Sequence, residues 1–215
     1  MIGQRNQGHV EPADPALVAE FRTVATAIIS DNLARLQGAT GLRPFHAGGA
    51  MAGTALTVRT CAGDNLFIHQ ALELVQPGDV IVVDGGGDIT RALVGEIMTT
   101  IARTRGAAGF VVDGAIRDAG AIGKSSFPCF ARAAIHRGPY KNGPGEINVP
   151  VSVGGLVVEP GDIVVGDEDG IVAFPQSDAA ELLRAVRQQE AREAQTLEDI
   201  KAGHYKGTYA KAPKS

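Results

Sequence analysis

The chain has 215 residues and a formal net charge of −4, and 44% of its residues are hydrophobic while only 5% are aromatic. This length supports one domain with a sizeable core, and the acidic balance excludes the basic surface of a nucleic-acid-binding protein. Because no apolar run reaches the roughly 20 residues that span a bilayer and no signal-like stretch opens the chain, we expect a soluble cytoplasmic protein with no membrane or nucleic-acid partner.

Hydrophobic spacing predicts alternating helices and strands through the first part of the chain. Asp14–Pro15 can start the first helix and Gly38 can end it. Asp64 can cap the second helix. In chain order, the expected elements are a helix over 14–37, a strand over 51–60, a helix over 65–74, a strand over 80–83, a helix that starts between 88 and 95 and ends near 105, a strand over 109–113 and a strand over 127–131.

The chain then changes to mostly strand. An irregular loop over 135–150, rich in Gly and Pro, has the length of loops that often carry binding groups. Residues 77–84 and 160–167 repeat a Pro-Gly-Asp turn that feeds a buried strand, and we interpret this repeat as structural. Asp169–Gly170 predicts a tight hairpin after the second copy.

A long helix is expected over 177–201, capped by Ser177. Its apolar stripe thins around 188–194, which suits a helix that crosses to another subunit. The alternation of strands and helices indicates a single α/β domain over 1–203. The polar, Lys-containing segment 204–215 is expected to be a flexible tail.

The strand expected over 109–113 leads directly into an arginine beside an aspartate, Arg117 and Asp118. A carboxylate at Asp118 can hold a hard divalent cation through oxygen, and the Arg117 guanidinium can stabilise an oxyanion that develops beside the metal. The same pair is also common as a helix cap with a solvated neighbour. The pair alone leaves both interpretations open.

A further acidic residue, Glu96, stands near the start of the helix that precedes this strand. The amides of Ile97 and Met98 beside it are donors that attract anions at a helix start. A small 2-oxo acid can lay its carboxylate there and turn its carbonyl oxygen toward Arg117 and a metal at Asp118, with Glu96 anchoring a water on the metal. The alternative for Glu96 is a first-turn glutamate favoured by the helix dipole.

These motifs resemble the RraA-like family, which contains divalent-metal 4-hydroxy-4-methyl-2-oxoglutarate and 4-carboxy-4-hydroxy-2-oxoadipate aldolases together with the regulators of ribonuclease activity A. The resemblance covers nearly the whole chain and therefore supports a family assignment. The segments that carry it are Ile29–Leu33, Gly53–Ala55, Asp64–Leu66, Pro77–Val80, Gly95–Glu96, Val112–Asp118, Asn148–Val151 and Pro160–Gly170.

The resemblance implies a swivelling β/β/α-type domain with a mixed sheet and flanking terminal helices, assembled as a homotrimer or hexamer with sites at subunit boundaries. It also implies Mg²⁺ or Mn²⁺ as cofactor. Asp118 would be the direct metal ligand, and Glu96 and a neighbouring subunit's Glu193 would meet the metal's water shell. The aldolase motif has glycine and aspartate where this chain has Ala92 and Glu96, so we expect the water to be positioned differently.

For the substrate, the resemblance assigns Arg117 to the oxo oxygen and the helix start at Gly95, with the amides of Ile97 and Met98, to the carboxylate. Lys141, in the irregular loop, is a candidate for a distal substrate carboxylate.

The predicted function is a carbon–carbon lyase that cleaves a 4-hydroxy-2-oxo acid to pyruvate through an enolate, with oxaloacetate decarboxylation through the same enolate. A metal-bound water is the expected base, because no histidine lies within these motifs. The alternative is a non-catalytic trimeric regulator that binds an endoribonuclease. A methyltransferase is disfavoured, because the glycine turn at 85–87 lacks the dinucleotide spacing. Cys61 and Cys129 are expected to be reduced core residues.

Overall fold

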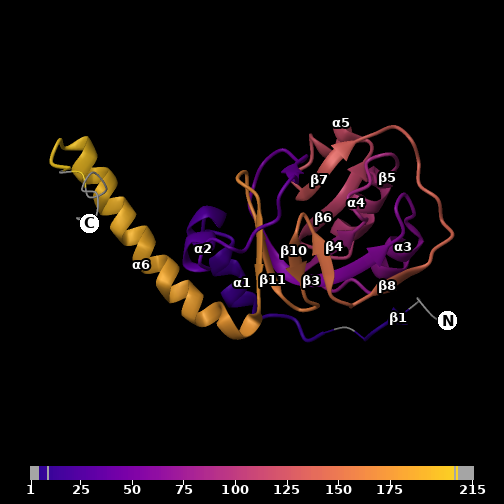
Figure 1. Cartoon of the computed structure of the whole chain (residues 1–215), viewed down its shortest axis with the longest axis horizontal. Helices are drawn as coiled ribbons and strands as arrows, with labels where there is room; N and C mark the ends of the chain where they lie inside the picture. Colours follow the sequence, from indigo (N-terminus) through magenta and orange to yellow (C-terminus); the bar gives the residue numbers. More distant parts are fainter. Residues whose placement is uncertain (1–4, 9, 206, 208–215) are drawn as a thin grey trace, which may run out of the picture.

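The protein folds around a ten-stranded mixed sheet, as described by a computed structural model for residues 5–8, 10–205 and 207 (Figure 1). A separate pair, β9 (Val151–Val153) and β10 (Leu156–Val158), forms an antiparallel ribbon. The strands of the large sheet are β1 (Arg5–Asn6), β2 (Arg43–Pro44), β3 (Met51–Thr60), β4 (Asp79–Asp84), β5 (Ala92–Val94), β6 (Gly109–Ile116), β7 (Cys129–Ala134), β8 (Gly145–Ile147), β11 (Ile163–Gly166) and β12 (Ile171–Phe174).

The centre of the sheet is parallel, in the order β3-β4-β6-β7, while β8 and β11 pair antiparallel to β3. The helices are α1 (Pro15–Phe21), α2 (Thr26–Asn32), α3 (Leu66–Leu72), α4 (Glu96–Thr104), α5 (Ala119–Ile122) and α6 (Gln176–Lys201). Helix α3 follows β3, and α4 follows β5, which pairs parallel to β6. Helices α1 and α2 lie between β1 and β2 in the chain, and α6 follows β12. The mixed α/β fold with flanking terminal helices is therefore confirmed.

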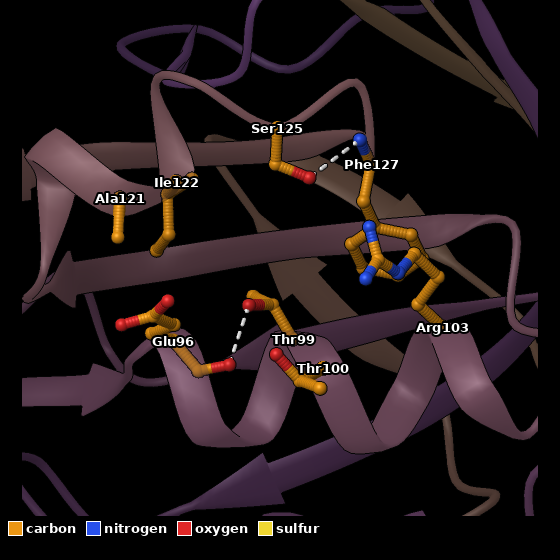
Figure 2. A pocket seen from close by; sticks show the side chains of 8 residues that line it. All are labelled: Glu96, Thr99, Thr100, Arg103, Ala121, Ile122, Ser125 and Phe127. Atoms are coloured by element: carbon orange, nitrogen blue, oxygen red, sulfur yellow. Dashed lines mark hydrogen bonds between the residues drawn. The ribbon is translucent and has the colours of Figure 1, made fainter.

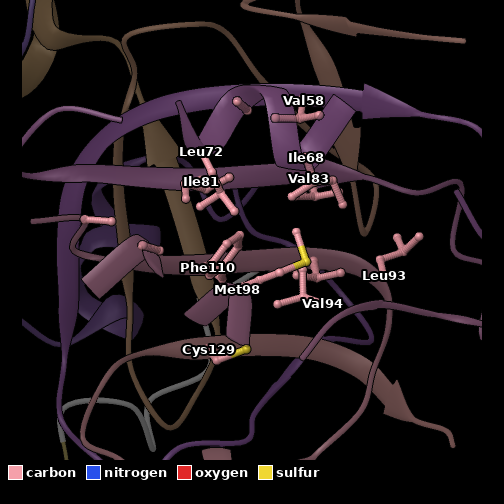
Figure 3. Packing of buried hydrophobic residues seen from close by; sticks show 14 of the residues in the cluster. Val58, Ile68, Leu72, Ile81, Val83, Leu93, Val94, Met98, Phe110 and Cys129 are labelled. Atoms are coloured by element: carbon pink, nitrogen blue, oxygen red, sulfur yellow. The ribbon is translucent and has the colours of Figure 1, made fainter. Parts of the chain in front are cut away.

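Both faces of the parallel centre are buried. In β4, Ile81 and Val83 pack under α3 and α4, whereas Val80 and Val82 face the β9–β10 side, and all four are fully buried. Figure 3 shows Met98 of α4 packed beside Phe110 at the centre of the first face. Burial on both faces explains why these strands appear in the sequence as continuous apolar runs.

A third cluster joins α1, α2 and the start of α6 to β11 and β12. Beyond this cluster α6 projects away from the body of the domain (Figure 1). Leu197 and Ile200 near its end are 55% and 49% exposed. The predicted tail over 204–215 lies largely outside the described residues.

The single helix predicted over 14–37 is wrong, because the structure divides it into α1 and α2. Asp14 caps α1 as expected, through its Oδ1 and the Ala16 amide at 2.9 Å. The start of α2 is capped by a residue far away in the sequence. Asp167 accepts hydrogen bonds from the Thr26 amide at 2.8 Å and from the Thr26 hydroxyl at 2.6 Å. A local sequence pattern does not contain this tertiary cap. Gly38 does not end the helix, since α2 stops at Asn32.

Several predicted bounds are also corrected. Strand β6 continues to Ile116 rather than ending at 113, and the loop expected over 135–150 contains β8. Strand β5 was not expected; it has three residues, which is too short to show a period of its own. The N-cap of α6 is Pro175, and the Ser177 hydroxyl donates to the Asp178 carboxylate instead.

The Pro-Gly-Asp repeat is structural, as interpreted from the sequence. In each copy the aspartate accepts a hydrogen bond from the amide three residues before it, from Gln76 to Asp79 at 2.8 Å and from Glu159 to Asp162 at 2.9 Å. The predicted hairpin at 169–170 is also present, because β11 and β12 pair antiparallel on either side of it.

The two cysteines differ. Cys129 is buried in β7, and this burial raises the pKa of its thiol to about 12. Cys61 is exposed, so the expectation that both are core residues is wrong for Cys61. None of the helices in the described part of the chain combines the length and apolar character that a membrane crossing requires.

Candidate functional site

Arg117 and Asp118 lie at the carboxyl end of β6, where the strand turns into the short helix α5. Asp118 has φ 57° and ψ 32°, in the left-handed region that residues with a side chain rarely adopt. Such a conformation costs about 1 kcal/mol or more; aspartate tolerates it better than most residues, and strained residues of this kind cluster at active and ligand-binding sites. The sequence identified this pair but gave no sign of its backbone conformation.

The Asp118 carboxylate reaches the first turn of α4. Its Oδ2 accepts a hydrogen bond from the Glu96 amide at 3.0 Å and lies 3.7 Å from Nε of Arg117. Gly95 permits this approach, because a Cβ at that position would lie 2.5 Å from Asp118 Oδ2 and 3.0 Å from Arg117 Cγ. The strand end and the helix start are thus brought into contact through a residue that has no side chain.

A hollow of about 260 Å³ opens beside this contact. Helix α3 and the loop after β7 supply its other walls. Its lining residues are Asn65, His69, Leu93, Gly95, Ile97, Met98, Arg117, Asp118, Gly138, Pro139 and Lys141. Six of the residues predicted to bind metal or substrate line this hollow: Gly95, Ile97, Met98, Arg117, Asp118 and Lys141. The predicted residue Glu96 does not line it.

The amides at the start of α4 are not equivalent. The Met98 amide donates to the Gly95 carbonyl at 3.1 Å and so closes the first turn. Within the described residues the Ile97 amide has no hydrogen-bond partner. Because the first amides of a helix carry its positive end, Ile97 is the free donor that an anion in the hollow would meet.

Lys141 is held against α3. Its ammonium nitrogen lies 2.8 Å from Nε2 of His69, which the sequence analysis had not included in the site. The loop that carries Lys141 is fixed by the buried Asp64, whose Oδ2 accepts hydrogen bonds from the amides of Asn142 at 2.6 Å and Gly143 at 3.1 Å. The lysine therefore extends from an anchored segment.

Asn65 is a second lining residue that the sequence analysis missed. It is only 3% exposed, and its amide nitrogen donates to the Leu93 carbonyl at 2.9 Å. Among the residues that the structure describes, its buried Oδ1 has no hydrogen-bond partner. Buried acceptors are rarely left unpaired, and this one belongs to a residue that lines the hollow.

The Glu96 side chain lines a separate hollow of about 120 Å³ between α4, α5 and the segment that follows α5. In Figure 2 its carboxylate lies beside Ala121 and Ile122, with Arg103 at the far end. Glu193, on α6, accepts a hydrogen bond from the Gln189 side-chain amide at 2.8 Å. It lines neither of these two hollows within this chain. The Glu96 amide, rather than its carboxylate, contacts Asp118 here.

The Asp118 carboxylate fits one class of metal. Within the described residues, no three His, Cys, Asp or Glu side chains come together, so a closed four-ligand zinc site is excluded there. Asp118 is 41% exposed, and its Oδ1 has no hydrogen-bond partner among the described residues. A single open carboxylate suits Mg²⁺ or Mn²⁺, because these ions prefer oxygen ligands and Mg²⁺ keeps several waters.

Comparison with known proteins gives a consistent result. A family model described as RraA-like (Aldolase/RraA) matches residues 26–173. A protein of Halalkalibacterium halodurans, provisionally named 4-hydroxy-4-methyl-2-oxoglutarate aldolase, is 41% identical over 180 residues, which cover 83% of this chain and 86% of the relative.

Solved structures have the same fold. The structure of Streptomyces coelicolor RraAS2, described as an unusual member of the RNase ES inhibitor RraA family, matches with a TM-score of 0.79 and 30% identity, covering 86% of this chain and 97% of that one. The RNA-processing inhibitor RraA from Thermus thermophilis matches with a TM-score of 0.64 and 34% identity, covering 70% and 92%.

Proposed function

Because the chain belongs to the RraA-like family, we propose that it is a divalent-metal-dependent lyase that cleaves a 4-hydroxy-2-oxo acid of the 4-hydroxy-4-methyl-2-oxoglutarate type to pyruvate. The aldolase names of its relatives support this reaction class. The observation that carries the proposal is the convergence of Arg117, Asp118 and the free Ile97 amide on one hollow.

We propose Mg²⁺ or Mn²⁺ at Asp118, where the bound ion would polarise the substrate's carbonyl oxygen as a Lewis acid. The Ile97 amide, at the positive end of α4, binds the substrate's C1 carboxylate. The Arg117 guanidinium donates to the C2 oxygen on the same side of the hollow. Glu96 and a neighbouring subunit's Glu193 are proposed contributors to the ion's water shell, which gives the trimer or hexamer a direct part in the site.

The reaction develops charge where the protein has donors. A water molecule in the hollow is the proposed base that takes the proton of the 4-hydroxyl group. The C4–O bond then becomes a carbonyl, and the C3–C4 bond breaks as its electron pair moves through C3 onto the C2 oxygen. With 4-hydroxy-4-methyl-2-oxoglutarate the distal half leaves as a second molecule of pyruvate. Arg117 stabilises the charge on that oxygen, and the enolate then takes a proton at C3 to give pyruvate. The unpaired Asn65 Oδ1 suits the substrate hydroxyl as a hydrogen-bond acceptor. Loss of CO₂ from oxaloacetate gives the same enolate, so the site should also decarboxylate oxaloacetate.

Pyruvate release from 4-hydroxy-4-methyl-2-oxoglutarate and from oxaloacetate, with Mg²⁺ and with excess chelator, tests the proposal. Arg117→Ala should lower kcat/KM by at least ~10²-fold, since the loss of one oxyanion donor has an effect of that size. Asp118→Asn should remove the metal-dependent rate. Arg103→Ala is the control, because Arg103 lies on α4, as Ile97 does, but lines the other hollow.

An endoribonuclease regulator is the second candidate, and the descriptions of the two solved RraA proteins favour it. A regulator that acts through its outer surface needs neither Arg117 nor Asp118. Metal-independent inhibition of an endoribonuclease that survives both substitutions, together with no pyruvate release from either substrate, would replace the lyase by the regulator.

A further inference from the structure

We infer that His69 is a positioning residue for Lys141, and that the pair forms a subsite selective for substrates with a carboxylate on the distal half. This inference rests on the proposed lyase function and deepens it. It assigns a role to a histidine that lies outside every sequence motif of the site.

The polarity of the contact follows from the two groups. A lysine ammonium has three donors and no acceptor, so at 2.8 Å the His69 Nε2 must be the acceptor. His69 is therefore the neutral tautomer with its proton on Nδ1. One ammonium donor is used by His69, which leaves two for a molecule in the hollow.

The pair is aimed into the hollow by fixed structure on both sides. His69 lies in the last turn of α3, and the loop that carries Lys141 is anchored by Asp64 through two backbone amides. The Tyr140 carbonyl also accepts a hydrogen bond from the Asn65 amide at 3.0 Å. Because both His69 and Lys141 line the hollow that contains Arg117, a substrate bound at Arg117 through its oxo end extends toward the ammonium group.

Two observations favour a carboxylate over a neutral group at this position. The ammonium is a compact charge with unused donors. Within the described residues no acidic side chain forms an ion pair with Lys141, whose hydrogen-bond partner is the neutral His69. An anionic substrate group would therefore be the first carboxylate to meet it.

The subsite should respond to pH. Burial, and then the charge of Lys141, lower the pKa of His69 from its ordinary value of 6.5, so the imidazole is neutral at neutral pH. As the pH falls through this lowered pKa, the imidazolium loses its acceptor and repels the ammonium group.

Other charged groups near α3 are either paired or separate from His69. Arg117 and Asp118 line the same hollow, while Glu96 and Arg103 line the other one. The other carboxylates near α3 are engaged: Glu73 pairs with Arg105, Glu146 with Arg5 and Arg59, and Asp64 accepts the amides of residues 142 and 143. Lys141 is thus the charge that couples directly to this histidine.

The test compares two reactions of the full-length protein with Mg²⁺. Cleavage of 4-hydroxy-4-methyl-2-oxoglutarate uses the distal subsite, whereas exchange of the methyl protons of pyruvate in D₂O needs only the enolate-forming groups. His69→Leu should raise KM for cleavage about tenfold, the effect of losing one hydrogen bond to a charged group, and leave pyruvate exchange unchanged. His69→Gln, which keeps an acceptor but does not titrate, should restore KM to within about threefold and abolish its rise at acidic pH. His204→Gln is the control, because His204 is exposed and lies three residues beyond the end of α6.

The outcomes separate the two proposals. A wild-type protein that neither cleaves the substrate nor exchanges pyruvate protons would overturn the lyase function and this inference with it. If wild type is active, two results would overturn the inference alone: an equal effect of His69→Leu on both reactions, or a His69→Gln variant as impaired as His69→Leu.

Discussion

Gly95→Ala is the substitution whose effect on the site follows most directly from the structure. The glycine has φ −144° and ψ −173°, an extended conformation that alanine adopts freely, so the backbone itself is not strained by the change. The new Cβ would lie 2.5 Å from Asp118 Oδ2 and 3.2 Å from Arg117 Nε. Ordinary contact begins near 3.4 Å, so the carboxylate must retreat by about 1 Å.

A displacement of this size is enough to damage catalysis without unfolding the protein. Misplacing a reacting group by about 1 Å can lower the rate about 10²-fold, and we expect that loss in kcat/KM for both cleavage and oxaloacetate decarboxylation. The hydrogen bond from the Glu96 amide to Asp118 would also lengthen, which would lower the free energy of unfolding by about 1 kcal/mol.

Gly120→Ala is the matched control. Gly120 lies two residues after Asp118, in α5, and a Cβ there would meet no atom within 4 Å. Kinetics and thermal unfolding of both variants, with calorimetric titration of Mg²⁺, separate a displaced site from a destabilised fold. Full activity of Gly95→Ala, or an equal loss in Gly120→Ala, would refute the proposal that the Gly95 contact positions Arg117 and Asp118.

Two further predictions concern stability. Asp167→Ala should lower the free energy of unfolding by about 1–2 kcal/mol, because it removes both hydrogen bonds that start α2 at Thr26; urea unfolding measures this, and an unchanged midpoint would contradict the capping role. Burial, and secondarily repulsion by Glu159 and Asp178, raises the pKa of Asp162 although its hydrogen bond from the Glu159 amide lowers it. The folded state therefore holds this proton more tightly, and stability falls as pH rises from the ordinary carboxyl pKa through the raised one. Asp162→Asn should remove this fall in stability. If the free energy of unfolding of the variant follows the same pH dependence as wild type between acidic and neutral pH, the prediction is contradicted.

The sequence predicted the parts of the fold that local patterns determine. The buried strand β3 was located at its observed bounds, and the apolar run of β4 was located within one residue at each end. The split between α1 and α2 was not predictable, because the cap comes from Asp167, some 140 residues away. Strand β8 was hidden in a Gly-rich loop, since a three-residue strand is defined by its pairing partner rather than by its own periodicity.

The same distinction applies to the site. Arg117 and Asp118 were identifiable because they adjoin each other at the end of a strand, and the amide of Ile97 because it stands beside Glu96 at an expected helix start. His69 and Asn65 were not, because each lies within an amphipathic helix or at its cap, where a structural role is the ordinary interpretation. Only the loop that brings Lys141 to 2.8 Å from His69 reveals their relation to the hollow.

Three features that each lower the stability of the folded state lie at the wall of this one hollow. Asp118 adopts a left-handed backbone conformation that costs about 1 kcal/mol or more. The buried Asn65 Oδ1 lacks a partner among the described residues, and an unpaired buried acceptor costs about 1–3 kcal/mol. The Lys141 ammonium is anchored beside a neutral histidine rather than a carboxylate. A protein that acted only through its outer surface would gain nothing from these arrangements. At an enolate-forming site, a substrate hydroxyl group would pair with the Asn65 oxygen, a substrate carboxylate would pair with the Lys141 ammonium, and the Asp118 conformation would place its carboxylate for a metal ion. The distribution of these costs therefore favours a catalyst over a regulator.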